Sequence, residues 1–339
     1  MTTKPKLETV AKAAGVSTAT ASQVMRGAGR ISEETRKKVL AAAKDLHYVR
    51  DGRAAAMRSG ENREIGFAIH QIANPFNAEV ISGASDLLES KGYLLSVLDS
   101  RDDVQRQRRN LEAFIQSSRG GLLWVPAEDT DDATYELLAR HGLPTVTFLR
   151  RSGKGRFDHV GIENREATRT ATTYLADLGH TKIAYLGGTA QFGVRTERII
   201  GYEGVLKERR LAAPIVWNSP DDKSSGLEAM NELMAQHPEV TAVVCNGDMV
   251  AIGACAAVTR KGLSPGKEIS VIGFDDVSDA SIAEPPLTTM AVSPYDLGRR
   301  LAKVVLDRMR DPDQPTSTTL AAAELVVRST TGACQGNNI

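Results

Sequence analysis

Small polar side chains follow one another along residues 17–23, which read Ser-Thr-Ala-Thr-Ala-Ser-Gln. Their hydroxyl and amide groups both donate and accept hydrogen bonds. Thr18 can contact the methyl group of a thymine or hydrogen-bond to a base, and Gln23 can pair with an adenine through two hydrogen bonds. On one exposed helix face, these residue types are suited to reading base edges in the major groove of DNA.

Two short helices are needed to present this segment. Gly15 suits the left-handed conformation that ends a helix, and Ser17 can cap a second helix over 18–25. Apolar residues recur at helical spacing on the inner faces of both helices, at Leu7, Val10, Ala11, Ala14, Ala21, Val24 and Met25. A helix-glycine-helix pattern is weak by itself, and an ordinary helical hairpin is the alternative.

A third helix with a basic polar face is expected to follow. Ser32 is its candidate cap, and Glu33 and Glu34 stand in the first turn, where the helix dipole favours anions. Its expected apolar face comprises Val39, Leu40, Ala43 and Leu46. Residues 1–60 hold 12 Lys and Arg against 5 Asp and Glu, whereas the remaining residues hold 30 against 37. The amino-terminal segment is therefore suited to binding phosphate backbones.

With these motifs the chain resembles the LacI/GalR family of transcription regulators over nearly its whole length. The signature runs Thr9-Val-Ala-x-x-Ala-Gly-Val-Ser-x-x-Thr-x-Ser-x-Val, then Ile31-Ser-x-x-Thr-Arg-x-x-Val and Ala41-Ala-x-x-x-Leu-x-Tyr48. Gln23 replaces an arginine frequent in the family, and Lys6 stands where a Thr or Ser cap is usual. The DNA-contacting residues that the resemblance implies in this segment are Thr18, Ala19, Thr20, Ser22, Gln23, Lys6 and Arg30.

Residues 50–61 form the expected linker after this segment. The resemblance implies a hinge helix that orders only on operator DNA, where Met57 takes the place of an apolar wedge in the minor groove. Ala54 matches the small residue that lets two hinge helices approach. Arg50 replaces a common proline and Gly52 disfavours a helix, so a flexible tether is the alternative.

From Arg63 onward, short apolar strands alternate with helices in two series. This alternation predicts two doubly wound α/β lobes, like those of a periplasmic binding protein, behind a three-helix helix-turn-helix head and hinge helix. We expect a DNA-binding domain over 1–49, the hinge over 50–61, an effector-binding and dimerisation domain over 62–331 and a tail over 332–339. The resemblance implies strand exchange, with lobe one at about 62–162 and 292–320, and lobe two at about 163–291 and 321–331.

Ligands of doubly wound sheets bind beyond the carboxyl ends of the strands. The resemblance, extended by Asn74-Pro-Phe and Val271-Ile-Gly-Phe-Asp-Asp276, implies a small-molecule effector between the lobes. Arg198 matches an arginine that reaches an effector hydroxyl or carboxylate, or else forms an interlobe salt bridge. Asp275 matches an acceptor for the effector, with a cap on the following turn as the alternative. Phe76 matches an aromatic wall of the site, with a core residue as the alternative. The candidate effector-binding residues are Phe76, Asn77, Arg150, Arg198, Asn246, Asp248 and Asp275.

The class of effector stays open at this stage. Leu149 stands where sugar-responsive relatives often place an aspartate. Loss of that aspartate, with Arg150 and Arg151 nearby, makes an anionic effector such as a sugar acid or sugar phosphate as credible as a neutral sugar. The alternative is that both arginines are surface residues. The usual outcome in the family is repression, and the expected ligand is a small-molecule, carbohydrate-related effector.

Other residue patterns argue against several classes of protein. The three cysteines are far apart, and the six histidines show no metal-ligand spacing, so we expect no metal and no cofactor. The first residues lack an apolar signal core, and no apolar run approaches the ~20 residues that span a bilayer. We therefore expect a cytoplasmic protein with no membrane partner.

The expected assembly is a homodimer on a palindromic operator, because the carboxyl-terminal residues hold no leucine heptads that tie dimers into tetramers. A periplasmic-type solute receptor without DNA function is the main alternative, but it would need a signal peptide and would lack residues 1–60. An enzyme is a further alternative. The sequence contains neither a supported catalytic triad nor a full dinucleotide fingerprint, so we expect no catalytic residues.

Overall fold

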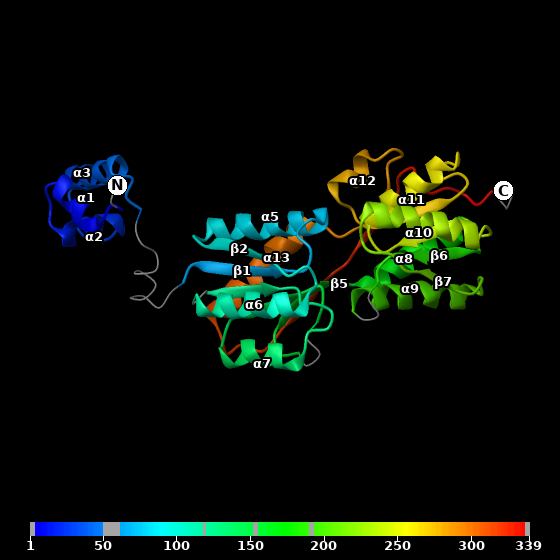
Figure 1. Ribbon diagram of the computed structural model, residues 1–339, viewed down its shortest axis with the longest axis horizontal. Coiled ribbons are helices and arrows are strands. Elements are labelled where there is room, and N and C mark those ends of the chain that lie inside the picture. Colours follow the sequence, from blue (N-terminus) through cyan, green and yellow to red (C-terminus); the bar gives the residue numbers. More distant parts are fainter. Residues whose placement is uncertain (1–3, 50–61, 118–119, 152–154, 190–192, 336–339) are drawn as a thin grey trace. The chain divides into compact units, whose positions relative to one another are not determined.

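The computed structural model describes residues 4–49, 62–117, 120–151, 155–189 and 193–335. The chain divides into two compact units, Met1–Asn62 and Arg63–Ile339, which we call the head and the body. Figure 1 shows the helices of the head and, in the body, two groups of strands and helices. Within the described residues, no helix is long and apolar enough to cross a membrane.

The head consists of α1 (Leu7–Ala13), α2 (Thr18–Met25) and α3 (Glu33–Asp45). Its buried core is made by Val10, Ala11, Ala21, Val24, Val39 and Ala43. The predicted caps are confirmed, because Ser17 Oγ accepts the amide of Thr20 at 3.0 Å and Ser32 Oγ accepts the amide of Thr35 at 3.2 Å. Lys6 precedes α1 and makes no side-chain capping bond.

One residue of α3 departs from the predicted face. Leu40 was expected among the buried residues, but its side chain is 48% exposed. Successive residues of a helix are rotated by about 100°, so Leu40 cannot share the inward stripe with Val39 and Ala43. Ala42 and Leu46 pack against the core at the edges of that stripe. Placing Leu40 on the buried face was therefore wrong.

The body holds two six-stranded sheets, with strand orders β11-β5-β4-β3-β1-β2 and β12-β10-β9-β8-β6-β7. The first sheet contains β1 (Glu64–Ile69), β2 (Leu94–Asp99), β3 (Gly121–Trp124), β4 (Thr145–Phe148), β5 (Asp158–Ile162) and β11 (Thr318–Ala321). The second contains β6 (Ile183–Leu186), β7 (Ile215–Trp217), β8 (Ala242–Cys245), β9 (Ser270–Asp275), β10 (Thr288–Ala291) and β12 (Glu324–Val326). Neighbouring strands are parallel except β10 and β12, which pair antiparallel.

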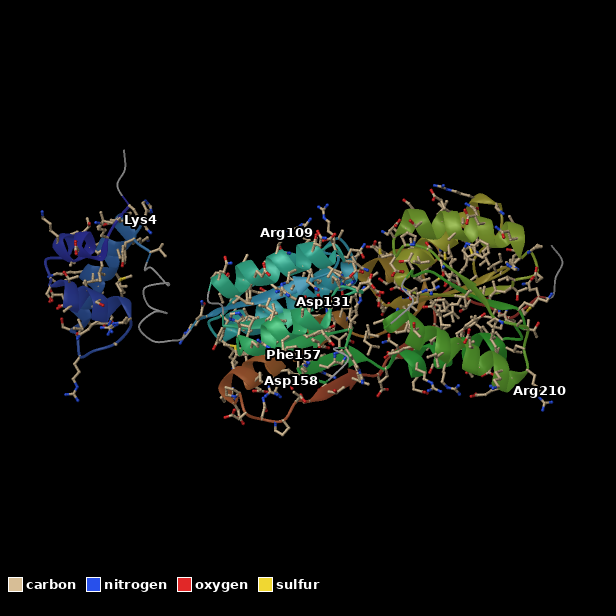
Figure 2. All side chains as sticks on the ribbon, turned by 60° about the horizontal axis from the view of Figure 1, so that its bottom comes forward. Lys4, Arg109, Asp131, Phe157, Asp158 and Arg210 are labelled. Carbon is tan, nitrogen blue, oxygen red and sulfur yellow. The ribbon has the colours of Figure 1, made fainter. Side chains whose placement is uncertain are left out.

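Helices cover each sheet and complete two lobes. The first lobe has α5 (Pro75–Ser90), α6 (Val104–Gln116), α7 (Asp132–Arg140) and α13 (Pro294–Arg310). The second lobe has α8 (Asn164–Asp177), α9 (Val194–Arg209), α10 (Lys223–Gln236), α11 (Asp248–Arg260) and α12 (Ser278–Ile282). Figure 2 shows side chains filling the space between each sheet and its helices, where the apolar core lies. The inner strands of each sheet are buried because helices cover both faces. The edge strands β2, β7, β11 and β12 are partly exposed.

The chain passes repeatedly between the lobes. It leaves the first sheet after β5, returns after β10 to form α13 and β11, and ends its last strand, β12, in the second sheet. Three connections therefore run between the lobes, after β5, β10 and β11. Such connections allow the lobes to change their relative angle while each keeps its own core.

Gly83 and Gly298 set the close packing of α5 against α13, because a Cβ on either would clash with the backbone of the other helix. A Cβ added to Gly298 would lie 2.0 Å from the carbonyl oxygen of Val80, which is a backbone atom and cannot rotate away. We expect Gly298→Ala to lower the free energy of unfolding by about 1–3 kcal/mol, because the two helices must separate. Urea denaturation of the full chain measures this change.

Gly204→Ala in α9 is the matched control, since the nearest atom to its added Cβ is the flexible end of Arg169 at 3.1 Å. Alanine is favoured over glycine in a helix by about 1 kcal/mol, so this variant should be as stable as the original chain or more stable. Equal urea midpoints for Gly298→Ala and the original chain would contradict the packing argument.

Candidate functional site

A cavity of about 420 Å³ lies between the two lobes of the body. Its walls follow the carboxyl ends of strands in both sheets: His70 follows β1, Asp102 follows β2, and Asn246 follows β8. This is where doubly wound sheets hold ligands, and the volume is typical of a small-molecule site. Of the predicted effector-binding residues, those that line the cavity are Phe76, Asn77, Arg150, Arg198, Asn246 and Asp275.

Arg198 is held in place by contacts within the second lobe. Its Nε donates to Asn164 Oδ1 at 2.9 Å, and its Nη1 donates to the carbonyl oxygen of Asn246. The guanidinium carbon lies 3.4 Å from the centre of the Phe274 ring. Arg198 is only 5% exposed and borders the cavity, so it presents an oriented cation there. None of these contacts is the interlobe salt bridge that was the alternative role for Arg198.

Asp275 ends β9 with a φ of 113°, a conformation that L-residues rarely adopt. Its side chain borders the cavity, is 9% exposed, and makes no hydrogen bond or ion pair with any described residue. Burial raises the pKa of this carboxyl well above its ordinary value, although the charge of Arg198 opposes the shift. Asp275 therefore places an unsatisfied carboxyl group at the cavity rather than capping the next turn.

Asp248 has a different place from the one expected. It is absent from the cavity wall and fully buried. Its Oδ2 accepts the amide of Val277 at 2.9 Å, and its Oδ1 accepts the hydroxyl of Thr289 at 2.6 Å. One oxygen thus fixes the turn after β9 and the other holds β10. Because both oxygens are used within the fold, we correct the prediction and remove Asp248 from the candidate effector site.

Phe76 and Asn77 begin α5, which Asn74 caps through a 3.0 Å bond to the Phe76 amide. The Phe76 ring stacks on Phe148 with centroids 6.2 Å apart and an interplanar angle of 4°. It therefore belongs to the core and also walls the cavity. Asn77 donates through Nδ2 to the carbonyl oxygen of Gln71 at 2.6 Å, while its buried Oδ1 has no partner within the described chain.

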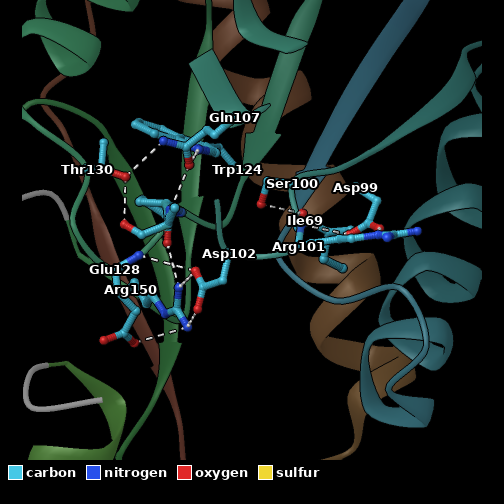
Figure 3. Close-up of polar contacts among 12 residues, drawn as sticks. Ile69, Asp99, Ser100, Arg101, Asp102, Gln107, Trp124, Glu128, Thr130 and Arg150 are labelled. Carbon is cyan, nitrogen blue, oxygen red and sulfur yellow. Dashed lines mark hydrogen bonds and ion pairs between the residues drawn. The ribbon is translucent and has the colours of Figure 1, made fainter. Parts of the chain in front are cut away.

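Arg150 is paired on several sides, as Figure 3 shows. Its Nη1 and Nη2 donate to the two carboxylate oxygens of Asp102 at 2.5 and 3.0 Å. Nη2 lies 3.1 Å from Glu128 Oε1, and Nη1 donates to the carbonyl oxygen of Pro126 at 2.9 Å. Two carboxylates thus neutralise one guanidinium. The expectation that Arg150 offers a free cation to an anionic effector is not supported by these contacts.

The cavity wall also includes four ionisable residues that the sequence analysis did not name, His70, Asp102, Glu128 and Asp221, besides Arg195. Asp221 follows β7, and the amide of Asn246 donates to both of its oxygens at 2.9 Å. The hydroxyl of Tyr185 in turn donates to Asn246 Oδ1 at 2.6 Å. The available signal was position, since polar residues shortly after a strand end are expected at this edge of the sheet.

Burial and neighbouring charges shift the pKa values of these added groups. Burial, helped by the charge of Arg150, lowers the pKa of His70 to about 4, so the ring is neutral at pH 7. Burial also raises the pKa of Glu128 and of Asp221. For Asp102, burial acts upward, but hydrogen bonds and the charge of Arg150 outweigh it and lower the pKa.

The residues expected to contact DNA lie at the start of α2 and around it. Thr18 and Ala19 are exposed, as are Lys6 and Arg30, whereas Gln23 is partly buried. Among the others, Thr20 and Ser22 are also partly buried. The hydroxyl of Thr20 lies 2.9 Å from Ser17 Oγ within the cap of the helix. Ala54 and Met57 fall outside the described residues.

Two family models match this chain. Residues 6–51 match the bacterial regulatory proteins of the lacI family, and residues 172–331 match a periplasmic binding protein-like domain. The transcriptional repressor PurR of Vibrio campbellii is 30% identical over 327 residues, which cover 96% of this chain and 98% of that protein. The chain belongs to the LacI family. Its predicted fold class, a helix-turn-helix head and a two-lobed α/β body, is thereby confirmed.

Other relatives of this LacI-family protein agree with the assignment. The ribose operon repressor of Haemophilus influenzae is 29% identical over 324 residues, which cover 95% of this chain and 97% of that protein. A lac repressor dimer bound to operator and an anti-inducer has a TM-score of 0.86 at 25% identity, covering 98% of this chain and all of that one. A complex of the regulator CelR with cellobiose has a TM-score of 0.73 at 26% identity, and the match covers 96% of this chain and 99% of that one.

Proposed function

We propose that this LacI-family protein is a repressor that binds a palindromic operator as a homodimer, and that a carbohydrate-class effector in the body cavity changes its operator affinity. The observation that carries the proposal is the convergence of Arg198 and Asp275 on a 420 Å³ cavity between two lobes, in a chain that begins with a helix-turn-helix head. An enzymatic, metal-dependent or membrane role is not part of the proposal, and the cytoplasm is the proposed location.

The DNA-binding part of the proposal assigns the head to base and phosphate contacts. Thr18, Ala19 and Gln23 would face base edges, while Lys6 and Arg30 would contact phosphates. The exposure of all but Gln23, which is partly buried, supports these roles. The DNA-binding domain would then comprise residues 1–49 and the effector-binding domain residues 62–331. A hinge over 50–61 would join them and place Ala54 and Met57 at the minor groove.

The effector part rests on groups that suit a hydroxyl-bearing ligand. Arg198 supplies oriented donors, Asp275 an acceptor, and Phe76 an apolar wall against which a sugar ring can pack. Relatives named as a ribose operon repressor and as a regulator in complex with cellobiose support this ligand class. Closure of the lobes on the effector would change operator affinity in proportion to the difference in effector affinity between the two states.

A selection from random duplexes, followed by mobility shift with the full chain, tests this function. We expect a palindromic sequence bound about 10³-fold or more tightly than random DNA at the same salt concentration. One member of a carbohydrate panel should change the operator affinity by at least about fivefold. Equal affinity for selected and random duplexes, or an operator affinity that no carbohydrate alters, would overturn the corresponding half of the proposal.

A further inference from the structure

Resting on the proposed role of the cavity as the effector site, we propose that Asp102 and Glu128 are specificity-determining residues. By occupying the guanidinium of Arg150, they make the site select an uncharged ligand rich in hydrogen-bond donors and reject sugar acids and sugar phosphates. The contacts around Arg150, the state of the other arginines and the groups left open in the cavity support this proposal independently.

Arg150 has little capacity left for an anion. Two of its nitrogens contact both oxygens of Asp102 and one oxygen of Glu128, and the carbonyl oxygen of Pro126 takes a further bond. Its side chain is 18% exposed, so the ion pairs are partly shielded from water. An anionic ligand would have to displace a carboxylate from a two-bond pairing with the guanidinium, which is the strongest arrangement available to these groups.

The carboxylates that mask Arg150 are held by the fold and do not depend on the ligand. Asp102 has a left-handed φ of 57° after β2, and its Oδ1 accepts the amide of Glu128 at 3.2 Å. The loop carrying Glu128 is fixed by Gln107, which is 1% exposed. Its Oε1 accepts hydrogen bonds from the Trp124 indole at 2.9 Å and from the Ala127 amide at 2.6 Å. Figure 3 shows this chain of contacts running from Gln107 toward Arg150.

The other two arginines of the cavity wall are also engaged. Arg195 donates through Nε to the carbonyl oxygen of Gly187 at 2.9 Å and through Nη2 to Asn218 Oδ1 at 2.5 Å. Arg198 donates to Asn164 and to the backbone of Asn246. Carboxyl groups on the described wall outnumber guanidinium groups by four to three, namely Asp102, Glu128, Asp221 and Asp275 against Arg150, Arg195 and Arg198.

Two of the unsatisfied groups at the cavity offer oxygen acceptors. The side chain of Asp275 makes no hydrogen bond or ion pair with the described residues, and the buried Oδ1 of Asn77 has no partner there. The buried Nδ1 of His70 also lacks a partner within the described chain, and it donates or accepts according to the tautomer of the ring. A ligand that brings hydroxyl donors satisfies these groups, whereas one that brings a negative charge adds repulsion in a desolvated site.

Inorganic phosphate tests the proposal without knowledge of the natural effector. We would titrate phosphate into the full chain by calorimetry, at constant ionic strength set with chloride. The double variant Asp102→Asn, Glu128→Gln keeps the shapes of both side chains while it removes their charges. We expect it to bind phosphate at least about tenfold more tightly than the original chain, because Arg150 is then unmasked.

Two further variants identify the source of the gain. Adding Arg150→Met to the double variant should remove the gained binding. The pair Glu136→Gln, Glu208→Gln removes the same net charge from exposed ion pairs outside the cavity and should leave phosphate affinity unchanged. Binding by the basic head is common to all these proteins and cancels in the comparison.

Three results would overturn the proposal: phosphate affinity in the double variant no higher than in the original chain, a gain that survives Arg150→Met, or an equal gain in the exposed-pair control. If the double variant fails to fold by circular dichroism, Glu128→Gln alone decides, with a smaller gain expected. These outcomes do not depend on operator binding. Failure of the specificity proposal can therefore be distinguished from failure of the proposed repressor function.

Discussion

Arg198→Leu is expected to abolish the response of operator binding to the effector, with effector affinity reduced about 100-fold or more. Arg198 is 5% exposed, lines the cavity and is oriented by Asn164, Asn246 and Phe274. Truncating one partner of a buried, hydrogen-bonded charge costs about 2–5 kcal/mol, which corresponds to this range. The measurement is an operator-release titration with the carbohydrate that gives the largest response in the screen.

Arg198→Lys separates the planar fork from the positive charge. Lysine keeps the charge but cannot donate to two acceptors in the fixed geometry of a guanidinium, so this variant should also respond weakly. Arg209→Leu on the same helix is the control, because its ion pair with Asp177 is half exposed and far from the cavity wall. An unfolding measurement on each variant checks that lost response is not lost folding. An unchanged effector midpoint in Arg198→Lys would refute the assigned role.

The paired change Thr18→Ala, Gln23→Ala is expected to weaken operator binding about 100-fold or more while random DNA is bound as before. Each good base contact contributes about 1–3 kcal/mol of discrimination, and both side chains lie on α2. A Cβ on Gly29 would lie 2.9 Å from Gln23 Oε1, so the glutamine amide rests beside the loop after α2 in the free protein. Competition mobility shifts at one salt concentration measure the ratio.

Lys37→Ala is the comparison variant for this prediction. Lys37 is an exposed, charged residue of α3 and not of α2. If it contacts a phosphate, its loss should weaken binding to operator and random duplexes alike. The number of ions released on binding, measured from the salt dependence of the affinity, should fall by about one. The base-reading assignment is refuted if the α2 variant loses affinity for both kinds of duplex to the same extent.

Local signals in the sequence were sufficient for the caps of the head and for the alternation of strands and helices. Ser17 and Ser32 bond to amides three residues ahead, so their roles depend on neighbours in the chain. Leu40 was misplaced because it and Val39 are adjacent apolar residues, and only packing of three helices shows which one is buried. Motif matching identified Arg198 and Asp275, both of which border the cavity.

The partners of Arg150 could not be found in the same way. Asp102 lies 48 residues before it in the chain, and no local pattern marks the pair. Asp102, Glu128 and Arg150 follow β2, β3 and β4 of the first sheet, in which β1 lies between β2 and β3. They meet only because parallel strands bring their carboxyl ends to one edge. Asp248 shows the reverse case, since it follows a strand end but is turned into the core by bonds to Val277 and Thr289.

By itself, the amino-acid sequence determined the family, the helix-turn-helix head, the two α/β lobes and the motif residues at the strand ends, because these depend on short-range periodicity, capping and spacing. The tertiary structure alone decided which of those residues border the cavity and which charges are neutralised there. Hydrogen bonds and ion pairs between residues distant in the chain exist only after strand order has brought them together. For that reason the charge of Arg150 could be read from the sequence, but its masking by Asp102 and Glu128 could not.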